Sequence, residues 1–176
     1  MKFPSLFILS FFFLSHAISA SSEQDMVVTL ADTLYGEVHV DFITNKIRIR
    51  NDKNYQFITA SQVRWIKKTD RHYCVAAFGV ESRYFIFEVL SKGGKSLLYR
   101  EGVKFNPYDD EAFPPFFVLE DRSAYSLATK KDVLSTFGQR QKKVKEFVKA
   151  NGLSFESRED LSRIFDYYND EEQADL

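Results

Sequence analysis

Three polar side chains on one predicted strand are the first candidates for chemistry. Glu37, His39 and Asp41 alternate with apolar residues, so all three point to the same face. Carboxylate and imidazole groups can together bind a divalent metal. The facing segment, residues 46–50, carries three cations, which would repel a metal ion. We therefore predict a solvated face with ion pairs here, and no metal site.

Cys74 and His72 share a face of another predicted strand, where a thiol beside an imidazole could act as a nucleophile. Cys74 is the only cysteine, so an internal disulfide is excluded, and the chain has too few histidines and cysteines for a zinc site. Its neighbours are apolar, which favours a small buried side chain. Hydrolase, metalloprotease and phosphate-loop motifs are absent from the sequence. We predict no catalytic residue and no cofactor.

An acidic loop bounded by prolines is the best candidate for binding. Asp109 and Asp110 offer oxygen ligands, but their spacing is not that of a calcium-binding helix–loop–helix. Tyr108, Phe113 and Phe116 bring aromatic rings to the same loop. These five residues either form a lip that binds a partner, or the rings pack the loop against the core.

The strands that must position these groups centre on residues 83–100. Two apolar runs are joined at Gly93-Gly94, which predicts a long β-hairpin whose turn uses positive φ angles. The first run is apolar on both faces, so we expect it to be covered on both sides. Residues 34–50 predict a second antiparallel pair, in which Val38 faces Ile49.

The pattern changes to helical periodicity near Thr129. Thr129 is predicted to cap a first short helix, residues 139–151 form a second that ends at Gly152, and Ser157 opens a third. Cations on these segments are expected to be the solvated side of helices whose narrow apolar stripes face the sheet.

Length and composition indicate one folded domain, and the predicted strands followed by helices indicate the α+β class. A chain of 176 residues, of which 44% are hydrophobic and 16% are aromatic, can fill a core. We predict an antiparallel β-rich domain over residues 21–128, a meander, partly closed barrel or sandwich. Three short C-terminal helices over residues 129–168 dock on it, and residues 169–176 are predicted to be a disordered acidic tail.

The N-terminus has the pattern of a secretory signal peptide. Lys2 precedes an apolar run that ends in small residues, and the run is too short to span a bilayer comfortably. We predict residues 1–20 to be a signal peptide, with cleavage after Ala20 preferred and after Ala17 as the alternative. The mature chain then lies in the periplasm or outside the cell and has no transmembrane segment.

Two stretches carry a resemblance. TLYGEVHVDFITNKIRIRND with the later SQVRWI, and the tail KKVKEFVKANGLSFESREDLSRIFDYYN, resemble a family of uncharacterised secreted proteins of Gram-negative bacteria. The resemblance implies export and a small β domain followed by a helical tail. The family has no assigned activity, so no site residue follows from it.

These observations favour an exported, non-enzymatic module that binds a protein partner or an envelope component. The net charge of −1 gives no general attraction to nucleic acid, and no nucleic-acid partner is predicted. Two alternatives stay open: a hydrolase that uses carboxylates distant in sequence, and a carrier of an apolar ligand inside a barrel.

The cleavage site is directly testable. When the full chain is expressed in a Gram-negative host, we expect the exported protein to begin at Ser21, because Ala20 completes the small-residue segment. Intact mass and N-terminal sequencing check this. A product that retains residue 1 would contradict the signal peptide.

Overall fold

The computed structural model describes residues 24–52, 54–79, 82–104 and 109–174; the predicted signal peptide lies outside them. The strands are β1 (Met26–Thr29), β2 (Thr33–Tyr35), β3 (Glu37–Asp41), β4 (Lys46–Asn51), β5 (Asn54–Thr59), β6 (Val63–Lys68), β7 (Arg71–Phe78), β8 (Arg83–Ser91), β9 (Ser96–Tyr99), β10 (Phe116–Glu120) and β11 (Ser123–Ser126). The helices are α1 (Lys130–Thr136), α2 (Gln141–Asn151) and α3 (Arg158–Ala174), with single 3-10 turns η1 (Ala60–Gln62) and η2 (Gly138–Arg140).

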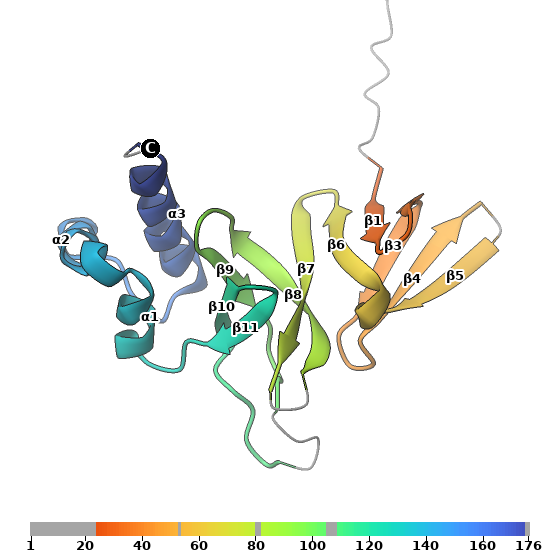
Figure 1. Cartoon of the computed structure of the whole chain (residues 1–176), viewed down its shortest axis with the longest axis horizontal. Helices are drawn as coiled ribbons and strands as arrows, with labels where there is room; N and C mark the ends of the chain where they lie inside the picture. Colours follow the sequence, from red (N-terminus) through yellow and green to blue (C-terminus); the bar gives the residue numbers. More distant parts are fainter. Residues whose placement is uncertain (1–23, 53, 80–81, 105–108, 175–176) are drawn as a thin grey trace, which may run out of the picture.

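The α+β class is confirmed, and the molecule has three parts along its long axis (Figure 1). Helices lie at one end, the β3–β4–β5 sheet lies at the other, and the larger sheet stands between them. The larger sheet has the order β11-β10-β9-β8-β7-β6-β1-β2. β11 also pairs with β7 in parallel at Ser123 and Ala77, which curls β7 to β11 into a partly closed five-stranded barrel. This parallel contact is not predicted by the sequence.

Three apolar clusters fill the spaces between these parts. The barrel interior holds Phe87, Leu98, Val103 and Phe117, all without exposed surface. A second cluster lies between the β3–β4–β5 sheet and β1, β6, β7 and β8, in sandwich fashion. A third lies between the helices and the outer faces of β9 and β10. β8 contributes to all three clusters, so its predicted cover on both faces is confirmed.

The predicted registers and caps are confirmed where local chemistry sets them. Val38 faces Ile49, because a slip by one residue would bury the charged face of β4. Thr129 and Asp132 form a capping box at the start of α1. Gly152 closes α2 with φ 63°, a left-handed conformation that glycine adopts at low cost.

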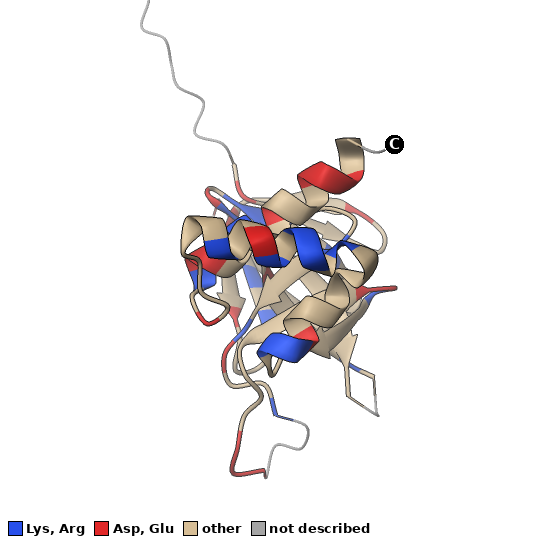
Figure 2. Ribbon diagram, turned by 90° about the vertical axis from the view of Figure 1, so that its left-hand side faces the viewer, with Lys and Arg blue, Asp and Glu red and all other residues tan. Residues whose placement is uncertain are grey.

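The helices pack as their apolar stripes predict. In α2, Val144 and Val148 are buried, and the Phe147 ring stacks on Tyr167 of α3 with a centroid distance of 4.0 Å. Lysines of α2 are exposed, and Figure 2 shows cations and carboxylates mixed over the helical end. No helix of the described residues is long and apolar enough to cross a membrane.

The reason for the two glycines in the β8–β9 turn differs from the prediction. Neither Gly93 nor Gly94 has a positive φ. Instead, a Cβ at Gly93 would overlap the side chain of Asn169, and one at Gly94 would overlap the carboxylate of Glu172. Gly93 is therefore needed because α3 brings Asn169 too close for a side chain there, whereas at Gly94 the overlapping atoms are the flexible end of Glu172.

The last helix is also longer than predicted. α3 continues to Ala174, whereas the sequence suggests disorder from residue 169. Asn169 explains the difference, because it is only 3% exposed and its side chain forms three hydrogen bonds with the β8–β9 hairpin, a contact that we call the clasp. Its Oδ1 accepts the backbone N–H of Lys95 at 3.0 Å, and its Nδ2 donates to the Lys95 carbonyl at 2.9 Å and to Ser91 Oγ at 3.2 Å.

This clasp yields a stability prediction. Asn169→Ala removes three hydrogen bonds and leaves the Lys95 N–H partly buried without a partner, so the free energy of unfolding should fall by about 2–3 kcal/mol. Urea unfolding followed by circular dichroism measures the change. The matched control is Asp170→Ala, at the next and exposed position of α3, which should change the free energy by less than about 0.5 kcal/mol. Equal effects of the two substitutions would contradict the clasp.

Candidate functional site

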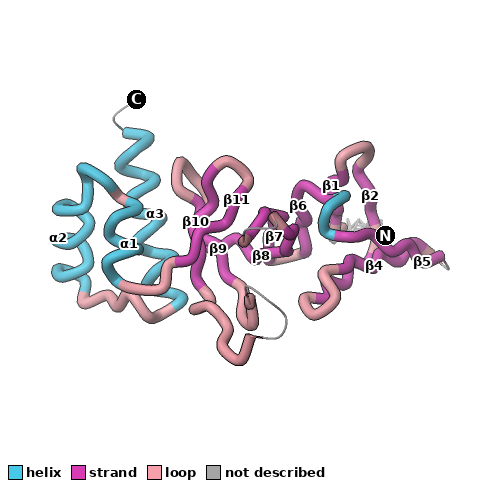
Figure 3. Tube along the Cα trace, turned by 60° about the horizontal axis from the view of Figure 1, so that its bottom comes forward, coloured by secondary structure: helices cyan, strands magenta, loops and turns pink. Residues whose placement is uncertain are grey.

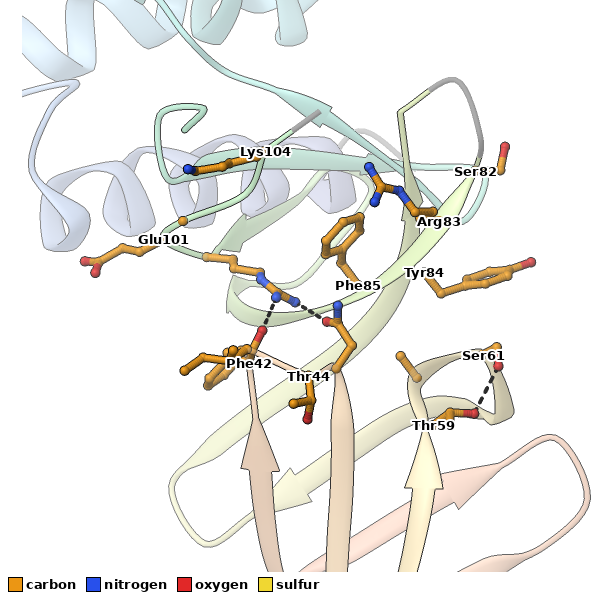
Figure 4. A pocket seen from close by; sticks show the side chains of 15 residues that line it. Phe42, Thr44, Thr59, Ser61, Ser82, Arg83, Tyr84, Phe85, Glu101 and Lys104 are labelled. Atoms are coloured by element: carbon orange, nitrogen blue, oxygen red, sulfur yellow. Dashed lines mark hydrogen bonds between the residues drawn. The ribbon is translucent and has the colours of Figure 1, made fainter. Parts of the chain in front are cut away.

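A cleft opens where the β3–β4 turn meets the barrel. It has a volume of about 800 Å³ and is lined by the β3–β4 turn, η1, the start of β8 and the segment after β9. Figure 4 shows Phe42 and Thr44 at the end of the β3–β4 pair, with Phe85 of β8 above them and the carboxylate of Glu101 directed away. The cleft therefore lies between two sheets that belong to different layers of the fold.

Arg100 joins these two layers. It follows β9, is only 7% exposed, and has its backbone N–H bonded to the Pro115 carbonyl at 2.8 Å. Its Nη1 donates to Asn45 Oδ1 at 2.6 Å and to the Ile86 carbonyl at 3.0 Å, and its Nη2 donates to the Phe42 carbonyl. The guanidinium thus ties the end of β9 to the turn of the smaller sheet.

The guanidinium is also surrounded by aromatic rings. Its carbon lies 4.9 Å from the centroid of Phe85 and 5.6 Å from that of Phe42, within the range of cation–π attraction. Burial lowers the pKa of Arg100 to about 10, because the charged form loses its hydration. The side chain still carries its positive charge at neutral pH.

Arg100 is incompletely satisfied. Its Nε has no hydrogen-bond partner, and no ion pair to it occurs among the described residues. A buried donor without an acceptor costs about 1–3 kcal/mol, and more when charged. Buried polar groups of this kind are uncommon in native proteins and require an explanation.

The other charged groups of the cleft do not neutralise Arg100. Glu101 accepts a hydrogen bond from the Tyr99 hydroxyl, which raises the pKa of that tyrosine. Lys104 also lines the cleft, and its Nζ donates to the Asp109 carbonyl at 2.7 Å. A second, smaller hollow of about 370 Å³ reaches Arg100 from the side of Arg158 and Glu88, which pair with each other.

A second candidate surface is the outer face and free edge of the smaller sheet. Tyr55 and Phe57 of β5 are 56% and 69% exposed. Phe57 lies beside Arg48 in the ladder, and the Arg48 guanidinium stands 5.7 Å from the Tyr55 ring centroid. In Figures 1 and 3, β5 lies at the outer end of the molecule.

The two edge strands of this sheet differ in whether their outer backbone groups have hydrogen-bond partners. At the β3 edge, the Val38 N–H donates to Asp25 Oδ2 at 3.2 Å and the Val38 carbonyl accepts from Lys68 Nζ at 2.9 Å. β5, in contrast, pairs only with β4 within the described part of the chain. Its six residues contain no charge, no proline and no bulge, the devices that usually protect an edge strand.

The predicted partner lip is not brought together as one surface. Phe116 is 9% exposed and packs against Tyr99, at a centroid distance of 5.5 Å. Phe113 lies in a different cluster, 5.1 Å from Phe78. Asp110 is exposed, and Tyr108 is outside the described residues. The two phenylalanines therefore pack the loop down, which is the second of the alternatives that the sequence leaves open.

One of the predicted ion pairs of β3 and β4 is present among the described residues. Glu37 pairs with Arg50 as the register requires. Asp41 accepts hydrogen bonds from the backbone of Ile43 and Thr44 and from the Thr44 hydroxyl, and these bonds lower the pKa of its carboxyl. Among the described residues, no group of three or more His, Cys, Asp or Glu lies close enough to hold a metal ion.

Sequence reasoning assigns no role to Arg100 or to β5. Arg100 reads as the polar end of a hairpin, and only the tertiary contacts bury it. β5 carries a usable signal, because NYQFIT is an uncharged, aromatic run beside a strand with three cations.

Comparisons with protein-family models, curated proteins and solved structures gave no match for this chain.

Cys74 gives a chemical prediction. Burial raises the pKa of its thiol from 9.0 to about 12, so the thiolate fraction at pH 8 is about a thousandfold below that of an ordinary thiol. Iodoacetamide should therefore alkylate the folded protein far more slowly than the protein in 8 M urea, as followed by intact mass. Equal rates in both conditions would show that the thiol is accessible and reactive.

Proposed function

We propose that this protein is an exported, non-enzymatic binding module that holds an extended segment of another protein along the free edge of β5. The observation that carries this proposal is the unprotected edge. A partner strand would form main-chain hydrogen bonds with β5, while side chains of the sheet face supply selectivity.

The side chains beside the edge suit a protein partner. Tyr, Phe and Arg are common among interface residues that dominate binding energy. Tyr55 and Phe57 present two rings on alternate positions of β5. Arg48 and Lys46 add positive charge on the same face, whereas Glu37 is already paired with Arg50. This charge favours a partner segment with acidic side chains.

The interior of the barrel supports a binder over an apolar carrier. A carrier needs a cavity inside the barrel, but Phe87, Leu98 and Phe117 are fully buried there. Among the exposed apolar side chains, the rings of Tyr55 and Phe57 lie on the strand whose edge is unprotected. Export rests on the N-terminal sequence pattern, and the resemblance to secreted proteins of Gram-negative bacteria agrees with it.

The binding mode can be tested with peptides. A library of random acidic-aromatic decapeptides is displayed and selected against the immobilised mature protein, and bound peptides are titrated in solution. Hydrogen exchange should show new protection of the alternate amides within residues 54–59 that point away from β4, because a new strand accepts their hydrogen bonds. The double variant Tyr55→Lys/Phe57→Lys should weaken the selected peptides at least about tenfold, which corresponds to the loss of about 1.4 kcal/mol.

Tyr125→Lys is the matched control, since Tyr125 is 53% exposed on a strand that is already paired on both sides. It should leave the affinity unchanged. Three results would overturn the proposal: no peptide is selected, protection maps away from β5, or β5 is protected in a concentration-dependent dimer without peptide. The last result would assign the edge to a second copy of the chain.

A further inference from the structure

We propose that the cleft at Arg100 binds a small organic carboxylate whose apolar part packs against Phe42 and Phe85. This site meets β5 only at its last residue, Thr59, and does not use the edge of that strand, so either proposal can fail without the other. The starting observation is that Arg100 is buried and positively charged, yet lacks a carboxylate partner among the described residues.

The unused donors of Arg100 lie in a suitable arrangement. A guanidinium has five N–H groups, and three of them donate to the carbonyls of Phe42 and Ile86 and to Asn45. Nη1 donates both of its hydrogens and Nη2 donates one, so the hydrogens that remain are one on Nε and one on Nη2. These two atoms form one edge of the guanidinium, and such an edge binds the two oxygens of a carboxylate in parallel.

The lining of the cleft matches the rest of such a ligand. Phe42 and Phe85 flank the guanidinium and provide apolar walls. Arg83 and Lys104 also line the cleft and add positive charge. The hydroxyl groups of Thr59, at the end of β5, and Ser61, on η1, lie 3.1 Å apart on the opposite side. A volume of about 800 Å³ is in the range of small-molecule sites.

The chemistry favours a carboxylate over inorganic phosphate. Phosphate has no apolar part, so it would leave the two phenylalanine walls in contact with water. An apolar ligand without charge would leave the Arg100 donors unused. Nε is shielded from solvent, so the side chains that cover it must shift for a ligand to reach it. A carboxylate joined to a ring or short alkyl group satisfies both the charge and the walls.

The test uses the full mature protein and phenylacetate as the probe. Two-dimensional NMR titration should show saturable shifts of the amides of Thr44, Asn45 and Phe85. Phenylacetamide, which has the same shape without the charge, and inorganic phosphate should each bind at least about tenfold more weakly. The ratio to phenylacetamide measures the contribution of the carboxylate, and the ratio to phosphate measures the contribution of the apolar part of the ligand.

Variants then assign the site. Arg100→Lys keeps the charge but loses the guanidinium edge, and it should weaken phenylacetate at least about tenfold. Because Arg100 also joins the two sheets, Lys104→Gln provides a second variant that leaves this junction intact, and it should weaken binding by about two- to fivefold. Arg64→Lys, at an exposed position of β6, is the matched control and should have no effect.

Several outcomes would overturn the proposal. Absence of saturable binding by phenylacetate up to 20 mM (on the order of the weakest affinity a useful site would have) would do so. Equal binding of phenylacetate, phenylacetamide and phosphate would also contradict it. Shifts that map outside the cleft, or an affinity unchanged in Lys104→Gln and in folded Arg100→Lys, would show that Arg100 serves only to join the sheets.

Discussion

Buried polar groups around one hairpin constrain the whole fold. Three polar or charged residues of the described chain are buried: Ser91, Arg100 and Asn169. Two belong to the β8–β9 region, and the third bonds to its turn. Burial of such groups is tolerable only when each has partners, so the hairpin fixes the positions of its neighbours. Asn169 brings α3 to one end, and Arg100 brings the β3–β4 turn to the other.

The buried polar groups at the two ends of the β8–β9 hairpin differ in how completely they are hydrogen-bonded. At the turn, the Asn169 side chain matches the N–H and carbonyl of Lys95, and Gly93 allows α3 to come close. At the opposite end, Arg100 makes three hydrogen bonds but retains an unpaired Nε. The helical end is thus a closed structural contact. At the other end, the Arg100 side chain also joins two parts of the fold, but it lies in a cleft and keeps a positive charge that a ligand can neutralise.

Much of the fold was predictable because local patterns determine it. The alternation of β3 and β4 sets their register, since Ile47 and Ile49 must face inward together while the cations face water. The caps at Thr129 and Gly152 follow from backbone groups that need partners at helix ends. The proposed binding surfaces were not predictable in this way. The sequence left open whether Phe113 and Phe116 form an accessible lip, and in the structure Phe113 packs with the barrel cluster and Phe116 with the helical cluster.

The sequence by itself determined the α+β class, the hairpins and the helix boundaries at Thr129 and Gly152, because each depends on residues only a few positions apart. Tertiary structure alone decided which polar residues are buried and which strand stays at an edge. From the sequence, Asn169 belongs to the acidic tail that is predicted to be disordered. In the structure it bonds to Lys95 of the β8–β9 turn, 74 residues away in sequence. Arg100 meets the carbonyl of Phe42 across a separation of 58 residues. Such contacts depend on how layers pack, and a periodic pattern carries no information about that.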